Sequence, residues 1–288
     1  MAPIFIKGCG RKKSLSDCTW AEIEQMAESG GASRYWHVGD KKTVVLSGDV
    51  SGTFEVQVAD FDFYDKADGS GRAGVVFAFT KNVIEDAHAS YGQSYRDTVE
   101  ITKQNDTDML GDELIKIKNS LPSDLKALIK TVKVKNAFGT TGLLAGSGPH
   151  YGPRSGAVKV ANVDLFPPSY AEIKNGESFR RRYTDYSVGG SETEIVQEGD
   201  ALELYRYSSA DDLRGGPLDK GGRTFLRTVY STYRGYYPGY IYIKSYDIQS
   251  GKMVTYDSSL SYRLTIYDED ENVVGTGATL GLCPMFCI

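Results

Sequence analysis

The sequence has few histidines and lacks the motifs by which common enzyme classes are recognised. Its three histidines are His37, His88 and His150, and none has a second histidine three or four positions away. That spacing places two imidazoles on one face of a helix, so its absence argues against a histidine-based metal site. The sequence also has no G-x-S-x-G turn, phosphate-binding P-loop or H-E-x-x-H helix. We therefore expect neither an enzyme nor a bound cofactor or metal.

Long hydrophobic runs are also missing. No run approaches the ~20 residues that a membrane-spanning helix needs, so no membrane span is expected. The opening stretch MAPIFIKGCGRKK has a short apolar piece followed by positive charge, which reverses the order found in a secretory signal. If the protein acts outside a cell, we expect it to leave within an assembly or by lysis.

Positive charge is not concentrated in any part of the chain. There are 33 lysines and arginines against 38 aspartates and glutamates, for a net charge of −5. Proteins that bind nucleic acid need a concentrated basic face, so nucleic acid is not an expected partner. The short RRR run at 180–182 predicts a solvated loop or an inter-subunit contact.

Cysteine is scarce, with Cys9, Cys18, Cys283 and Cys287 present. Cys9 and Cys18 are too far apart for a tight zinc knuckle, although the spacing of Cys283 and Cys287 is permissible for one. On a strand the latter two would lie on one face, four residues apart, and could not bond to each other. Buried free thiols are the favoured interpretation. A disulfide is the alternative, without a secretion signal to support it.

The pattern of hydrophobic residues predicts an α+β protein with early and central helices and a β-rich, mainly antiparallel C-terminal half. Residues 1–14 are expected to form an N-terminal arm, whose PIFI stretch could add a strand to a neighbouring subunit, and residues 15–288 a single domain. A first helix is predicted at about 18–29, capped by Ser16 or Asp17 and stopped by Gly30-Gly31.

Further helices are predicted in DELIKIKNS and, restarting at Pro122, in LPSDLKALIKTV, with a short helical turn in SYAEIKNGESF. Strands are predicted at 42–48, 52–64, 74–83 and 157–166, the last one stopping at Pro167-Pro168. After residue 200 the β-like runs are ALELYRYS, GRTFLRTVYS, GYIYIKSYD, GKMVTYD, SYRLTIYDED and ATLGLCPMFCI.

An acidic cluster follows the second predicted strand and consists of Asp60, Asp62, Asp65 and Asp68. The stretch DKADGSG lacks the D-x-[DN]-x-[DN]-G spacing and the closing glutamate of a calcium loop. A turn with solvated carboxylates is therefore favoured, and a bound cation is the alternative.

Tyrosines are concentrated between residues 228 and 247. Tyr240 and Tyr242 alternate with isoleucines, which predicts a strand with one tyrosine face. The segment YRGYYPG at 233–239 instead predicts a turn, bracketed by glycine and proline. Aromatic residues on a turn supply contact area at small entropic cost. The predicted binding face, for a neighbouring subunit or a host-surface ligand, consists of Tyr233, Arg234, Tyr236 and Tyr237.

Four blocks of the sequence together resemble the DUF6273 domain family. TWAEIEQMAESGGASRYWHVGDKKTVVLSG is similar to the opening of that family, which reads W-x-x-I and then Tyr-Trp-x-Val-Gly-Asp. FDFYDKADGSGRAGVVFAF is similar to its next strand, turn and strand. LPSDLKALIKTVKVK is similar to its central helix, and GLCPMFCI to its C-terminal strand. The blocks follow the family order and span roughly residues 18–288.

This resemblance implies a C-type-lectin-like fold and a biological context rather than a chemistry. Such domains are common in virion structural proteins of phages that infect Gram-positive bacteria, and in bacterial surface proteins. The family has no catalytic set to transfer. The C-terminal half departs from the family pattern, because Phe225, Leu226 and Arg227 alone represent its Trp-Trp-Leu-Arg-Ser-Pro signature. A ligand surface built there can therefore differ from that of its relatives.

We accordingly expect a non-enzymatic virion structural protein, located on the tail, baseplate, fibre or capsid surface. Its expected partners are other virion proteins and further copies of itself, with a host-surface glycan or protein as an additional partner. The alternative is a carbohydrate- or receptor-binding adhesin module of a bacterial surface protein.

Overall fold

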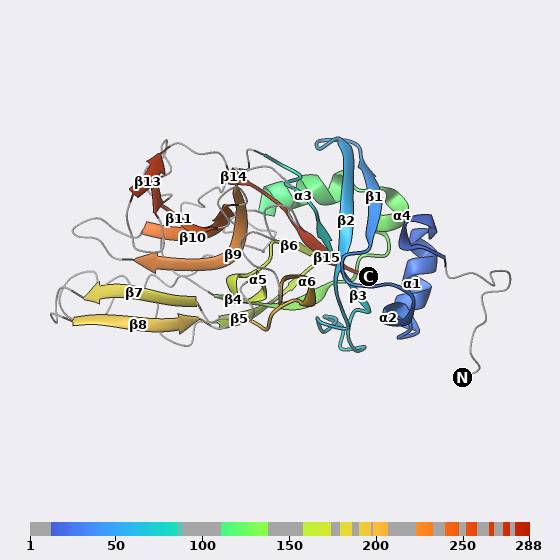
Figure 1. Cartoon of the computed structure of the whole chain (residues 1–288), viewed down its shortest axis with the longest axis horizontal. Helices are drawn as coiled ribbons and strands as arrows, with labels where there is room; N and C mark the ends of the chain where they lie inside the picture. The colour runs from blue at the N-terminus through green and yellow to red at the C-terminus, as the bar shows by residue number, and fades with distance from the viewer. Residues whose placement is uncertain are drawn as a thin grey trace.

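The computed structural model describes most of the chain (Figure 1). The described residues are 13–85, 87, 111–137, 158–173, 179–185, 190–196, 198–206, 223–232, 240–247, 252–257, 265–267, 273–276 and 280–288. Of the expected N-terminal arm, only Lys13 and Ser14 are therefore described, and the division into an arm and a single domain stays a prediction.

The first helix, α1 (Trp20–Glu28), forms where the hydrophobic spacing predicts it. Its cap differs from the expectation. Thr19, not Ser16 or Asp17, is the N-cap, and its side chain accepts the Glu22 N–H while the Glu22 carboxylate accepts the Thr19 N–H. Such a capping box satisfies two N–H groups that the helix itself leaves unpaired. Ser16 and Asp17 instead belong to a preceding 3-10 turn, η1 (Leu15–Asp17). Gly30 ends α1 in a left-handed conformation, as predicted.

A five-stranded antiparallel sheet organises the part of the structure around α1. The strand order is β1-β2-β3-β15-β6, and every neighbouring pair is antiparallel. The first three strands lie where the sequence predicted them. β15 comes from the C-terminal end of the chain and lies between β3 and β6. The bounds are β1 (Lys41–Leu46), β2 (Gly52–Phe61), β3 (Val75–Phe79), β6 (Leu165–Phe166) and β15 (Met285–Cys287).

Aromatic side chains join α1 to this sheet. The Trp20 ring lies edge-on to Phe77 of β3, with centroids 5.7 Å apart, and to Phe286 of β15 at 6.3 Å. Phe77 and Phe286 stack on each other at 5.4 Å. All three side chains are buried, and such pairs stabilise by about 0.5–1.5 kcal/mol beyond the burial of their area. The core therefore connects segments that are far apart in the sequence.

The middle of the chain contains a helix pair and a strand where a longer helix was expected. The second predicted helix forms as α3 (Gly111–Ser120), and the short α2 (Ala32–Tyr35) was not predicted. The helix expected to restart at Pro122 is only α4 (Ser123–Lys126), with Pro122 as its N-cap. The following residues form β4 (Val132–Ala137), which pairs with β5 (Val158–Val163). Val132 and Val134 are buried while Lys133 and Lys135 are exposed, so alternation overrides the helical expectation.

A second, six-stranded sheet lies in the C-terminal part. Its order is β13-β12-β11-β10-β9-β14, antiparallel except for the β14–β9 pair. Figure 1 shows its outer strands at the opposite end of the molecule from α1 and α2. The predicted strand runs from residue 223 onward are confirmed as β9 (Arg223–Thr232), β10 (Tyr240–Asp247), β11 (Lys252–Asp257), β12 (Thr265–Tyr267), β14 (Leu280–Gly281) and β15, whereas β13 (Val273–Thr276) was not predicted.

Two segments differ from the sequence prediction. ALELYRYS was expected to be β-like, but the structure has a helical turn there, α6 (Glu203–Arg206). Leu202 and Tyr205 are both buried at helical spacing. The RRR run was expected in a solvated loop or an inter-subunit contact. It lies in β7 (Phe179–Asp185), paired with β8 (Gly190–Val196), so the loop is wrong and the inter-subunit contact stays a prediction. The helical turn predicted in SYAEIKNGESF is confirmed as α5 (Tyr170–Ile173).

Three of the four cysteines are buried free thiols, as predicted: Cys18, Cys283 and Cys287. Burial raises the pKa of each thiol above its ordinary value. A raised pKa keeps a cysteine in its unreactive thiol form, so these residues behave as small core side chains. Cys9 lies outside the described residues.

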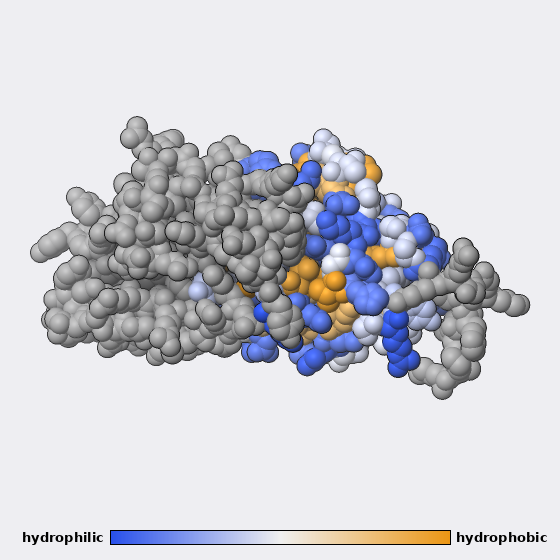
Figure 2. Space-filling model, viewed as in Figure 1, coloured by the Kyte–Doolittle hydropathy of each residue, from blue (hydrophilic) through white to orange (hydrophobic). Residues whose placement is uncertain are grey.

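The described surface has no large apolar patch. On the face seen in Figure 2 it is mostly hydrophilic with small hydrophobic areas. The exposed large hydrophobic side chains of the described residues come from three separate elements and are Tyr35, Val45 and Val160. A helix long and apolar enough to cross a membrane does not occur in the described segments.

Candidate functional site

The tyrosine-rich segment 233–239, predicted as a binding face, lies in the sequence between two paired strands. β9 ends at Thr232 and β10 begins at Tyr240, and these two residues are register partners. Tyr240 and Tyr242 lie in β10, so the strand predicted for them is confirmed. The residues predicted to make the contact lie outside the described residues: Tyr233, Arg234, Tyr236 and Tyr237.

The aspartate cluster is dispersed into separate structural roles. Asp60 accepts the N–H of Glu203 at 2.9 Å and of Phe61 at 2.7 Å, and thus caps α6. Asp65 pairs with Arg72 across the turn, and Asp68 accepts the Ser70 N–H at 2.8 Å. Within the residues that the structure describes, no group of three or more histidine, cysteine or acidic side chains could hold a metal ion.

A buried ionic cluster joins the two parts of the molecule. Arg227 of β9 and Glu172 of α5 are 0% and 1% exposed, and they form a two-pronged pair, with one N–H···O distance of 2.6 Å. The Tyr64 hydroxyl donates to the same carboxylate at 2.6 Å. Arg227 also donates to the carbonyl oxygens of Pro167 at 3.0 Å and Lys135 at 3.1 Å. Sequence analysis placed Arg227 in a degenerate signature but did not identify its partner.

The electrostatics of this cluster indicate a structural role. Burial and the neighbouring Glu172 carboxylate raise the pKa of Tyr64 far above its ordinary value. Burial alone would lower the pKa of Arg227, but the charge and hydrogen bond of Glu172, together with Tyr64 and Glu198, outweigh burial and raise that pKa. Both groups therefore favour their protonated forms. Their hydrogen bonds are directed at the Glu172 carboxylate and, for Arg227, also at the backbone.

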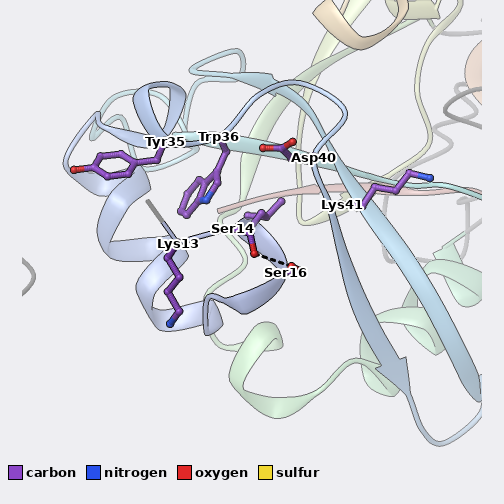
Figure 3. Close-up of a pocket in the computed structure, with 8 residues that line it drawn as sticks. Lys13, Ser14, Ser16, Tyr35, Trp36, Asp40 and Lys41 are labelled. Atoms are coloured by element: carbon purple, nitrogen blue, oxygen red, sulfur yellow. Dashed lines mark hydrogen bonds between the residues drawn. The ribbon is translucent and has the colours of Figure 1, made fainter. Parts of the chain in front are cut away.

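A cavity of about 330 Å³ lies next to the start of α1 (Figure 3). It is lined by residues 13–16 before α1, by Tyr35 and Trp36 at the end of α2, and by Asp40 and Lys41 at the start of β1. The turn between α2 and β1 positions the last two. Asp40 accepts the His37 N–H at 2.9 Å, and Gly39 has φ +91°, a conformation that favours glycine.

Most charged groups of the cavity already have a partner. Lys13 donates to both carboxylate oxygens of Glu22 at 2.6 and 2.8 Å. Lys41 lies 3.6 Å from Glu55, and Ser14 donates to Asp17 at 2.5 Å. The lining therefore has little uncompensated charge.

Trp36 differs from its neighbours in the cavity wall. The side chain is only 3% exposed, and its indole Nε1 is buried without a hydrogen-bond partner among the described residues. Buried polar groups almost always have a partner, and an unmade bond costs about 1–3 kcal/mol. In the sequence, Trp36 attracts attention only through the YWHVGD stretch of the family resemblance, so the cavity itself was not predicted.

No protein-family model, curated protein or solved structure matches this chain. The resemblance to the DUF6273 family therefore stays a prediction from the sequence, and the α+β architecture is what the structure itself establishes.

Proposed function

We propose that this chain is a non-enzymatic structural protein of a phage virion, with a C-type-lectin-like variant of its α+β domain. In this proposal it occupies the tail, baseplate, fibre or capsid surface. It contacts other virion proteins and further copies of itself there, and takes part in contacts with the host surface.

One observation carries the proposal. The four sequence blocks that resemble the virion-associated family supply a common core. Trp20 comes from the first block, Phe77 from the second and Phe286 from the last, and their rings are in mutual contact. Leu125 and Val132 of the third block are buried in the same hydrophobic core. The residues that carry the resemblance thus pack together, as a shared fold requires, and this supports the proposal.

Mass spectrometry of purified particles tests the virion role. Particles from a lysate of cells that produce this chain are separated by density gradient and digested. The expected result is that peptides of the chain co-migrate with the capsid and tail proteins through the gradient, while host cytosolic proteins do not. A chain found only in the soluble fractions would contradict the proposal.

The alternative, a carbohydrate- or receptor-binding module of a bacterial surface protein, is favoured by a different observation. The cavity at Trp36 combines an aromatic wall, a carboxylate and amino groups, the mixture found in small-molecule sites. Immunofluorescence on intact producing cells distinguishes the two proposals. An antibody against this chain labels unlysed cells if the chain is a surface protein, and does not label them if it is a virion component.

A further inference from the structure

We propose that the cavity between η1, α2 and the start of β1 binds one neutral sugar residue, with the Trp36 indole N–H as a donor to a ring or hydroxyl oxygen. This deepens the host-surface and carbohydrate-binding roles proposed above, and it assigns the ligand to a part of the chain other than the tyrosine-rich segment at 233–239.

The unpaired indole nitrogen is the first argument. Trp36 is almost completely buried, yet no described residue accepts its N–H. Phenylalanine would fill much of the same space without leaving a buried donor unpaired, so packing alone gives no reason for a tryptophan. A ligand oxygen supplies the missing acceptor.

The charge balance of the wall favours a neutral ligand over an anion. Lys13 is hydrogen-bonded to Glu22, Lys41 lies 3.6 Å from Glu55, and the Asp40 carboxylate would repel a carboxylate or phosphate. A sugar hydroxyl can donate to Asp40 and accept from a lysine or the indole at the same time. The set of one acceptor carboxylate and several donors therefore matches a polyhydroxylated molecule.

Size and shape limit the ligand to a single ring. The volume of about 330 Å³ lies at the lower end of the roughly 300–1,000 Å³ of ligand pockets. Tyr35 lines the cavity and is 45% exposed, so an aromatic residue stands at its solvent-facing rim. One terminal residue of a surface glycan fits these dimensions.

Access to Trp36 requires a small movement of one wall. Its Nε1 is shielded from solvent, and in Figure 3 the indole ring points toward the segment that contains Ser14 and Ser16. Both serines are exposed and belong to, or adjoin, the short turn η1 rather than a long element. Ligand entry therefore displaces this turn and changes the surroundings of the indole.

The test uses the indole N–H itself as the reporter. The sequence has two tryptophans, so a ¹⁵N-labelled full-length chain gives two indole signals in a proton–nitrogen correlation spectrum. Trp36→Phe removes one signal and assigns it, and Trp20 in the core serves as the internal control. The ligands are D-glucose, D-galactose, N-acetyl-D-glucosamine and L-rhamnose, with D-glucuronate and inorganic phosphate as the anionic comparison.

We expect the Trp36 signal to shift saturably with at least one neutral sugar while the Trp20 signal stays in place. Calorimetry should show about tenfold weaker binding of that sugar to Trp36→Phe, the loss that corresponds to one hydrogen bond. Lys41→Ala should also weaken binding, whereas Lys81→Ala, which removes an exposed lysine outside the cavity, should not.

Three outcomes would overturn the inference. They are a Trp36 signal that no neutral sugar moves, a shift produced by the anions alone, and unchanged sugar affinity in Trp36→Phe. Incorporation into particles is measured separately on the unmodified chain, so failure of the sugar site and failure of the virion role give different results.

Discussion

Replacing Glu172 by glutamine should be among the most destabilising single-atom changes in this protein. The substitution leaves the Arg227 guanidinium fully buried without its carboxylate. In the wild type, the Glu172 carboxylate oxygens accept hydrogen bonds from the Arg227 guanidinium, the Tyr64 hydroxyl and the Ser169 N–H. The substitution replaces one of these acceptor oxygens by an NH₂ group, which cannot accept them. Removing one partner of a buried pair costs about 3–5 kcal/mol, a large share of the ~5–15 kcal/mol that stabilises a typical protein.

Urea unfolding followed by circular dichroism measures this cost. With a slope of about 3 kcal/mol per molar urea, a loss of that size lowers the midpoint by about 1–1.7 M. The matched control is Glu55→Gln, which breaks the Lys41–Glu55 pair. Its side chains are 45% and 52% exposed, so the expected cost is below about 1 kcal/mol.

A double substitution distinguishes the cost of leaving one buried charge of the Arg227–Glu172 pair unpaired from the cost of losing hydrogen bonds. In Glu172→Gln with Arg227→Met, neither member of this pair is left as a buried charge without the other, so we expect the double variant to be more stable than the sum of the single effects predicts. If the Glu172→Gln midpoint falls by no more than that of Glu55→Gln, or if the two single effects simply add, the reasoning about the buried charge is wrong.

Two further predictions concern α1. The hydrogen bond from Lys13, and then the Thr19 N–H, lower the pKa of Glu22 to about 2. Since its pKa is lower in the folded state, Glu22 should stabilise the protein above pH ~4.5 and lose this effect as the pH falls through about 2. The stability difference between the wild type and Glu22→Gln, measured by unfolding from pH 7 to 2, should therefore shrink toward the acid end. A difference that stays constant with pH would contradict a stabilising role of the ionised Glu22 carboxylate. Separately, Gly74→Ala should cost about 1–3 kcal/mol in urea unfolding, because its Cβ would lie 2.6 Å from the Ala27 carbonyl oxygen; an unchanged midpoint would show that α1 moves away freely.

Local patterns in the sequence predicted those elements whose burial follows one simple period. Trp20, Ile23 and Ala27 recur at helical spacing and form α1, the alternation in β1 is equally direct, and β3 is a continuous apolar run that is buried throughout. The prediction failed where two periods compete over a few residues. In α6, Leu202 and Tyr205 fit a helix, but the neighbouring aromatic and hydrophobic residues also fit a strand.

Contacts between distant segments could not be predicted from one sequence. Nothing local indicates that Arg227 meets Glu172, or that Asp60 caps a helix more than a hundred residues later. The cavity at Trp36 depends on three segments that come together only in the folded chain. Its one visible trace in the sequence was a tryptophan beside a Gly-Asp turn.

The central position of β15 affects how the protein can fold during synthesis. The thiol of Cys283 hydrogen-bonds the Phe79 carbonyl across 204 residues of sequence, and β15 pairs with β3 directly beyond it. At about 5–20 residues per second, the ribosome needs about 10–40 s between making the two segments. Throughout that interval, one edge of β3 has no β15 to pair with, and Phe77 and Phe79 lack their contacts with Phe286. The high contact order of this sheet thus makes its closure a late event, and nascent chains that have not reached residue 285 are the species that chaperones must protect from edge-to-edge aggregation.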